Sequence, residues 1–191
     1  MTIQKINIRF SVLAAMILLA AFSRIIPHMP NFSPLGAISL FGAAHFQKKW
    51  LALVVPIAAT WLSDLFINNV IYAQYYPKFT WFYSGFYWQY GSYLLIVFAA
   101  LFIFKKINLK TMLAATITST VIFFLVSNFG VWLGSNFYPQ TFDGLITCYA
   151  AGIPFLKGTF LGDVVYCGVL FGGFALAQKQ FPVLRLAHYY K

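Results

Sequence analysis

The sequence contains very few acidic residues and few charges of any kind. Its 191 residues include three Asp and no Glu, and charged residues make up 8% of the chain. A soluble domain carries about 25% charged residues, so this chain lacks the groups needed to cover a water-facing surface. Three carboxylates also make a two-metal or paired-carboxylate site difficult to build. We therefore expect no metal site and no cofactor.

Cysteine and catalytic motifs are equally sparse. Cys148 and Cys167 are the two cysteines. We place the first in an outer loop and the second inside a helix, and therefore expect no disulfide between them; their spacing also fits no zinc site. No H-E-x-x-H, G-x-S-x-G or P-loop motif occurs. A Ser–His pair that uses His28 is the one catalytic arrangement left open, and we expect the protein not to be an enzyme.

Hydrophobic residues are what the sequence has in abundance. They make up 61% of the chain, and aromatic residues alone make up 20%. A transmembrane helix needs about 20 predominantly apolar residues. The sequence predicts a single all-α domain in the lipid bilayer, a bundle of about six transmembrane helices at residues 8–26, 32–46, 50–68, 85–104, 111–133 and 153–177.

The positive charges predict the orientation of this bundle. With six spans, ten of the 13 Lys and Arg residues fall on one side, in the two ends of the chain and in the turns near Lys48 and Lys105. Only Arg24, Lys78 and Lys157 fall on the other side. Cytoplasmic loops carry the Lys and Arg excess, so we expect both termini in the cytoplasm, most simply at a bacterial inner membrane. The charges form no amphipathic stripe, and we expect no nucleic-acid binding.

The polar residues within the apolar stretches gather near the predicted outer face. Ionisable groups at membrane depth are costly, and they commonly pair or mark a functional site. Arg24 is expected to pair with Asp64 or Asp163, either to lock helices together or to hold a ligand. The candidate ligand-binding residues are Arg24, His28, Asn31, Asp64, Asn128, Trp132 and Asp163. Arginine would act as an anion clamp or ion-pair partner, asparagine as a neutral hydrogen-bond donor and acceptor, and tryptophan as an aromatic wall.

Several motifs resemble a family of bacterial multi-pass membrane proteins of unknown function. The opening motif, R-x-x-P-H-x-P-N-F-[ST]-P-x-G-A, begins at Arg24, and Leu40-Phe41-Gly42-Ala43 follows it. Later stretches that resemble the same family are Asn128-Phe129-Gly130-Val131-Trp132, Tyr138-Pro139, Ile153-Pro154-Phe155 and Gly162-Asp163. The resemblance covers nearly the whole chain and implies no particular activity.

The chain is more distantly similar to S-components, the vitamin-capturing subunits of energy-coupling-factor transporters. The shared features are six helices, an alanine-rich first helix and a Pro-, Asn- and Gly-rich segment before the second helix. The resemblance implies a ligand near the outer face, and a coupling-module subunit docked on Ala14 and Ala15 of the first helix. It leads us to expect a membrane protein that binds a vitamin or related micronutrient for uptake. The alternative is a non-catalytic structural or accessory subunit of a larger membrane complex.

Overall fold

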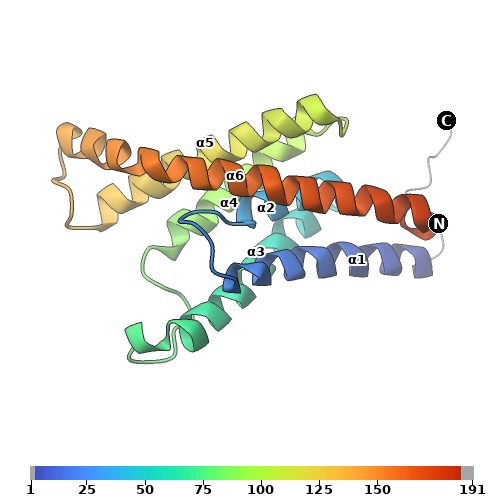
Figure 1. Cartoon of the computed structure of the whole chain (residues 1–191), viewed down its shortest axis with the longest axis horizontal. Helices are drawn as coiled ribbons and strands as arrows, with labels where there is room; N and C mark the ends of the chain where they lie inside the picture. The colour runs from blue at the N-terminus through green and yellow to red at the C-terminus, as the bar shows by residue number, and fades with distance from the viewer. Residues whose placement is uncertain (1–2, 186–191) are drawn as a thin grey trace.

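Helices joined by short connections make up the whole of the chain that the computed structural model describes, residues 3–185 (Figure 1). No strand occurs within these residues. The main helices are α1 (Ile3–Phe22), α2 (Leu35–His45), α3 (Lys49–Phe66), α4 (Phe86–Ile103), α5 (Leu109–Gly134) and α6 (Phe142–Gln180). Short helical turns accompany them: η1 (Ser23–Ile25), η2 (Ile67–Ile71), η3 (Ala73–Tyr75) and η4 (Pro182–Leu184).

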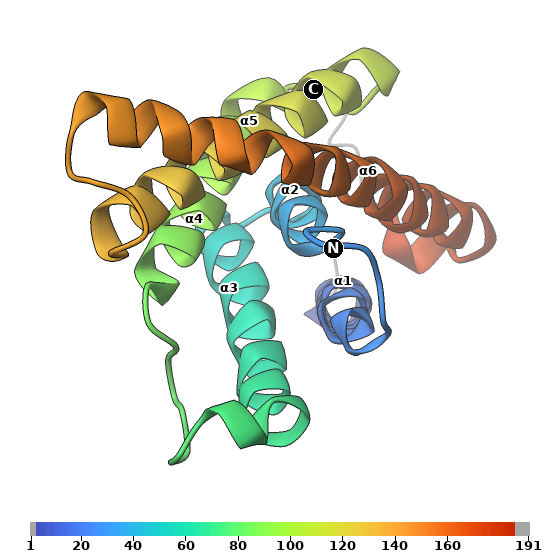
Figure 2. The same ribbon diagram turned by 60° about the vertical axis from the view of Figure 1, so that its left-hand side comes forward.

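Five of the helices are long and apolar enough to cross a membrane, and α2 is the exception. Its 11 residues rise only about 16 Å, roughly half of the hydrocarbon thickness of a bilayer. Every residue from Leu35 to Ala43 is buried. Figure 2 shows α2 at the centre of the molecule, surrounded by the other five helices. A helix that is hydrophobic on all sides belongs in such a protein-enclosed position.

Helix α6 begins much earlier than the sequence predicted. We expected an outer loop up to residue 152 and a helix at 153–177, but α6 runs from Phe142 to Gln180 without interruption. The hydroxyl of Thr141 accepts a hydrogen bond from the backbone N–H of Gly144 at 3.2 Å and so caps the first turn. Pro154 lies within the helix. At 1.5 Å per residue, the 39 residues of α6 rise about 58 Å, more than the full thickness of a bilayer.

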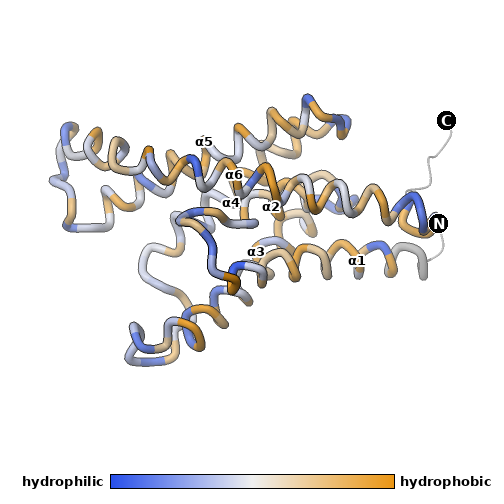
Figure 3. Tube along the Cα trace, viewed as in Figure 1, coloured by the Kyte–Doolittle hydropathy of each residue, from blue (hydrophilic) through white to orange (hydrophobic). Residues whose placement is uncertain are grey.

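The two ends of the described chain lie together. The start of α1, the turn between α4 and α5, and the end of α6 are at the same end of the long axis (Figure 1). Arg9 of α1 donates hydrogen bonds to the carbonyl of Leu184 in η4 and, at 3.2 Å, to the carbonyl of His45. Most hydrophilic segments lie at turns and helix ends, while the helices are mainly hydrophobic along their length (Figure 3).

Candidate functional site

The connection between α1 and α2, residues 26–34, lies directly on the backbone of α6. A Cβ atom added to Gly162 would lie 2.7 Å from the backbone nitrogen of Ser33 and 2.9 Å from its carbonyl oxygen. A Cβ atom added to Gly158 would overlap the carbonyl oxygen of Pro30. These two glycines are four residues apart and therefore share one face of α6. The absence of side chains on that face lets this connection, which we call the strap, approach α6 closely.

Asn31 lies at the point where the strap turns over α6. Its φ angle is 60°, in the left-handed region that asparagine adopts more readily than most residues. Asn31 is exposed and borders two adjoining cavities. The strap thus carries an amide side chain to the place where the cavities meet.

The smaller cavity has a volume of about 270 Å³ and lies beneath the strap. We call it the acidic cavity, because the Asp163 carboxylate is part of its wall. Its lining comes from η1, the strap, α2, the π-helical turn η2 and the residue after it, and helices α4, α5 and α6. The residues that line it are Arg24, His28, Asn31, Ser33, Leu35, Gly36, Ile67, Tyr72, Gln89, Tyr93, Phe123, Thr159 and Asp163.

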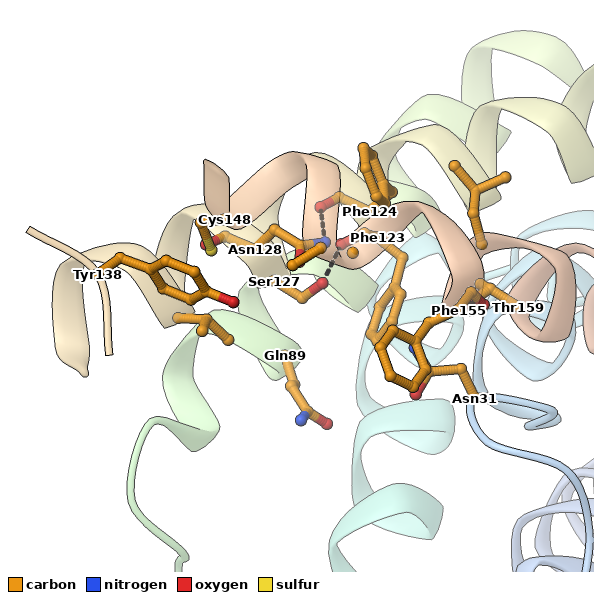
Figure 4. Close-up of a pocket in the computed structure, with 14 residues that line it drawn as sticks. Asn31, Gln89, Phe123, Phe124, Ser127, Asn128, Tyr138, Cys148, Phe155 and Thr159 are labelled. Carbon is orange, nitrogen blue, oxygen red and sulfur yellow. Dashed lines mark hydrogen bonds between the residues drawn. The ribbon is translucent and has the colours of Figure 1, made fainter. Parts of the chain in front are cut away.

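The larger cavity has a volume of about 360 Å³ and lies between α4, α5 and α6 (Figure 4). We call it the aromatic cavity, because Phe123, Phe124, Phe155 and Tyr138 form much of its wall. Asn31, Gln89, Phe123 and Thr159 line both cavities, which therefore adjoin along these residues.

Arg24 forms its ion pair with Asp64. The guanidinium Nη1 atom lies 2.6 Å from Oδ1 of Asp64 and donates a second hydrogen bond to the hydroxyl of Ser63 at 3.0 Å. Tyr90 donates to the other carboxylate oxygen of Asp64 at 2.7 Å. Both oxygens of Asp64 are therefore engaged, and the arginine charge is matched where it borders the acidic cavity.

Asp163 has no such partner. Its side chain is buried at 1% exposure, and no described Lys, Arg or His forms an ion pair with it. The hydroxyl of Thr120 donates to Oδ2 at 3.3 Å. The neighbouring Ser119 hydroxyl is buried without a hydrogen-bond partner. A Cβ atom on Gly36 would lie 2.5 Å from the Ser119 oxygen and 2.8 Å from Cγ of Asp163, so the carboxylate needs a glycine at this position of α2.

Gln89 of α4 lies where the two cavities meet. A tyrosine in the connection before α4, residues 76–85, holds its side chain there. The hydroxyl of Tyr83 donates a hydrogen bond to Oε1 of Gln89 at 2.9 Å. Burial, and then the charge of Asp64, raises the pKa of the Tyr83 hydroxyl well above its ordinary value. The hydroxyl therefore stays protonated and remains a donor, so it fixes the orientation of the amide.

Of the seven candidate residues, five line the cavities: Arg24, His28, Asn31, Asn128 and Asp163. Asn128 donates to the carbonyl of Phe124 at 2.8 Å and packs against Gly152, where a Cβ atom would clash with it. Asp64 lines neither cavity and instead pairs with Arg24, which lines the acidic cavity. Trp132 donates from its indole nitrogen to the carbonyl of Pro139 at 3.0 Å, so it closes the turn between α5 and α6 and does not line either cavity.

The sequence reasoning missed the hydroxyl and amide groups around Asp163. Thr116, Ser119 and Thr120 are buried on one face of α5, at helical spacing within an otherwise apolar run. This spacing could have predicted a polar face of α5 directed into the interior of the bundle. Gln89 and Thr159 were not among the candidates, although Thr159 lies four residues before Asp163 and therefore on the same face of α6.

Residues 4–184 match a protein family described as a family of unknown function, DUF6580. The match covers nearly the whole chain. Neither the curated proteins nor the solved structures provide a match.

Proposed function

Because the chain belongs to DUF6580, a family of unknown function, we propose its function from its own geometry: it captures a small organic molecule for uptake across a membrane. The observation that carries the proposal is the pair of adjoining cavities, of about 270 and 360 Å³, beneath the strap. Ligand sites are typically concave and mostly apolar, with a few convergent polar groups. Here Asn31, Gln89 and Thr159 converge where the cavities meet.

We further propose that the cavities face the non-cytoplasmic side. They are bordered by the strap after α1, the first turn of α4 and the last turns of α5. Each of these segments is at the opposite end of its helix from the basic residues, which lie in the first turns of α1 or around the turn between α4 and α5. Because cytoplasmic segments carry the Lys and Arg excess, this arrangement favours cytoplasmic termini and an outward-facing site. We assign the protein to the bacterial cytoplasmic membrane on the same reasoning.

The proposed arrangement is that of an S-component, with a ligand such as a vitamin or related micronutrient held under the connection between the first two helices. Ala15 is exposed on α1 and Ala14 is half-buried beside it. Small side chains let helices approach closely in a bilayer. We propose this face of α1 as the docking surface for a coupling subunit.

The test of capture compares two tryptophan variants on α6. Ala151 lines the aromatic cavity, whereas the adjacent Ala150 is exposed and borders neither cavity. Gently purified wild-type protein is analysed by native mass spectrometry for a co-purified metabolite, and a panel of vitamins is screened for stabilisation against heat. We expect a retained or stabilising molecule for wild type and for Ala150→Trp, and its loss in Ala151→Trp, because the indole fills the cavity.

The alternative function, a non-catalytic accessory subunit, predicts a different outcome. In that case the wild-type protein retains no metabolite, no compound raises its melting temperature, and the two tryptophan variants behave alike. Capture by Ala151→Trp as efficient as that by wild type would also exclude the cavity as the binding site.

A further inference from the structure

We propose that the captured molecule carries a cationic nitrogen group, which binds Asp163, on an apolar or aromatic body, which extends into the aromatic cavity. This inference rests on the capture function proposed above and specifies the chemical class of the ligand. Its basis is the balance of charge around the acidic cavity and the side chains that surround the carboxylate.

The charge balance leaves one carboxylate without a counter-ion. Arg24 and Asp163 both border the acidic cavity, but the arginine is held at 2.6 Å by Asp64, which lies behind the wall. His28 also borders the cavity, yet its described contact is with the carbonyl of Met29 and it forms no ion pair with Asp163. A buried carboxylate requires a compensating charge or a proton, particularly at membrane depth. A ligand cation supplies that charge from within the cavity.

The carboxylate also has unused capacity to accept hydrogen bonds. An ionised carboxylate offers about four acceptor positions, and here the Thr120 hydroxyl donates to Oδ2 at 3.3 Å while the backbone of Ala37 also interacts with the carboxylate. The Ser119 hydroxyl beside it has no partner, although it is buried. Oδ1 lies against Gly36, where a Cβ atom would overlap it, and both residues border the acidic cavity. An ammonium group, which only donates, matches this set of acceptors.

The rest of the wall favours an organic cation over a metal ion. Hard metal ions such as Ca²⁺ are commonly bound by several carboxylates, whereas this cavity offers one, and the described residues contain no cluster of three or more His, Cys, Asp or Glu that could hold a metal. Tyr93 and Phe123, whose rings lie parallel with centroids 5.7 Å apart, form an aromatic wall of the same cavity. Aromatic side chains beside a carboxylate are suited to a cation that carries an organic body. Phe123 continues into the aromatic cavity, where Phe124 and Phe155 would contact that body.

The experiment measures binding of three probes that share a phenyl ring and a short chain but carry head groups of different charge: phenethylamine, the neutral 2-phenylethanol and the anionic phenylacetate. Each probe is titrated into purified wild type, Asp163→Asn and Asp143→Asn, and binding is followed by thermal stabilisation and calorimetry. Asp143 lies in the exposed first turn of the same helix and borders neither cavity, so it provides a matched control. The charge of any co-purified metabolite is determined in parallel.

We expect wild type and Asp143→Asn to bind the amine more tightly than the alcohol or the acid. Asp163→Asn should lose about tenfold or more in affinity for the amine, the amount expected for a charge-assisted hydrogen bond, and little for the alcohol. An anionic or neutral co-purified molecule, or equal amine binding by the two Asp→Asn variants, would overturn the cationic assignment while leaving capture intact. A wild-type protein that binds no probe and retains no metabolite would overturn both.

Discussion

The contact between the strap and α6 predicts that two identical substitutions on one helix have opposite effects. Gly162→Ala places a Cβ atom 2.7 Å from the backbone nitrogen and 2.9 Å from the carbonyl oxygen of Ser33. Favourable contacts of carbon need about 3.5 Å, so the strap must move by roughly 0.5–1 Å. Gly172→Ala, ten residues further along α6, meets no atom within 4 Å. Both variants gain the same helix propensity, about 1 kcal/mol in water.

The propensity gain cancels when the two variants are compared, which leaves the cost of overpacking. Inserting a methyl group into a well-packed contact costs about 1–3 kcal/mol. We expect the upper half of this range, because the atoms in the way are main-chain atoms of a strap that contains Pro27, Pro30 and Pro34. A difference of about 2 kcal/mol corresponds to roughly 4–8 °C in melting temperature for a chain of this size.

The assay is thermal unfolding of both variants in the same detergent, followed by fluorescence and by loss of soluble protein. We expect Gly172→Ala to melt at or above the wild-type temperature and Gly162→Ala several degrees below it. Ligand binding should fall in Gly162→Ala alone, since its strap no longer covers the acidic cavity correctly. Equal melting temperatures for the two alanine variants would show that the strap does not rest on α6.

Three further predictions concern charged residues. Arg24→Gln should destabilise the protein by about 2 kcal/mol, less than the loss of a fully buried pair, because the Arg24 side chain is 19% exposed. In a double-mutant cycle followed by thermal unfolding, adding Asp64→Asn should restore part of this loss, and strictly additive losses would contradict the pairing. Arg9→Lys should lower the melting temperature, because an ammonium group cannot bind the Leu184 and His45 carbonyls as the guanidinium fork does, and an unchanged temperature would refute this role. In a cysteine-free background, a cysteine at exposed position 78 should react with an impermeant thiol reagent added to intact cells, whereas one at exposed position 106 should react only after lysis. The reverse pattern of labelling would show that the proposed orientation is inverted.

The sequence is most informative where a physical requirement is local. A run of about 20 apolar residues is sufficient to predict a membrane-spanning helix, and the scarcity of charges makes a soluble domain untenable. The grouping of Arg24 with an aspartate followed from the cost of an unpaired charge in lipid. Which aspartate forms the pair did not follow, because helices as uniformly apolar as these have no periodicity that fixes their rotation.

The remaining features depend on contacts between distant segments. Arg9 was interpreted only as a cytoplasmic charge, but it is buried, with its guanidinium 5.0 Å from the centre of the Phe174 ring. Its partners in α2, η4 and α6 are 36 or more positions away in the chain, and no local pattern relates them to it. The early start of α6 was missed because polar residues and Pro154 resemble a loop, although Thr141 is a favourable capping residue.

The contact of the strap with α6 joins the first connection of the chain to its last long helix. Arg24 and Asp64 are 40 positions apart in the chain, so both are synthesised well before α6. Asp163 emerges much later and finds Gly36 and Thr120 only when α6 docks against the strap. A chain that ends before α6 would therefore contain both members of the ion pair but lack Asp163 and the α6 wall of both cavities, so it should not support the proposed capture.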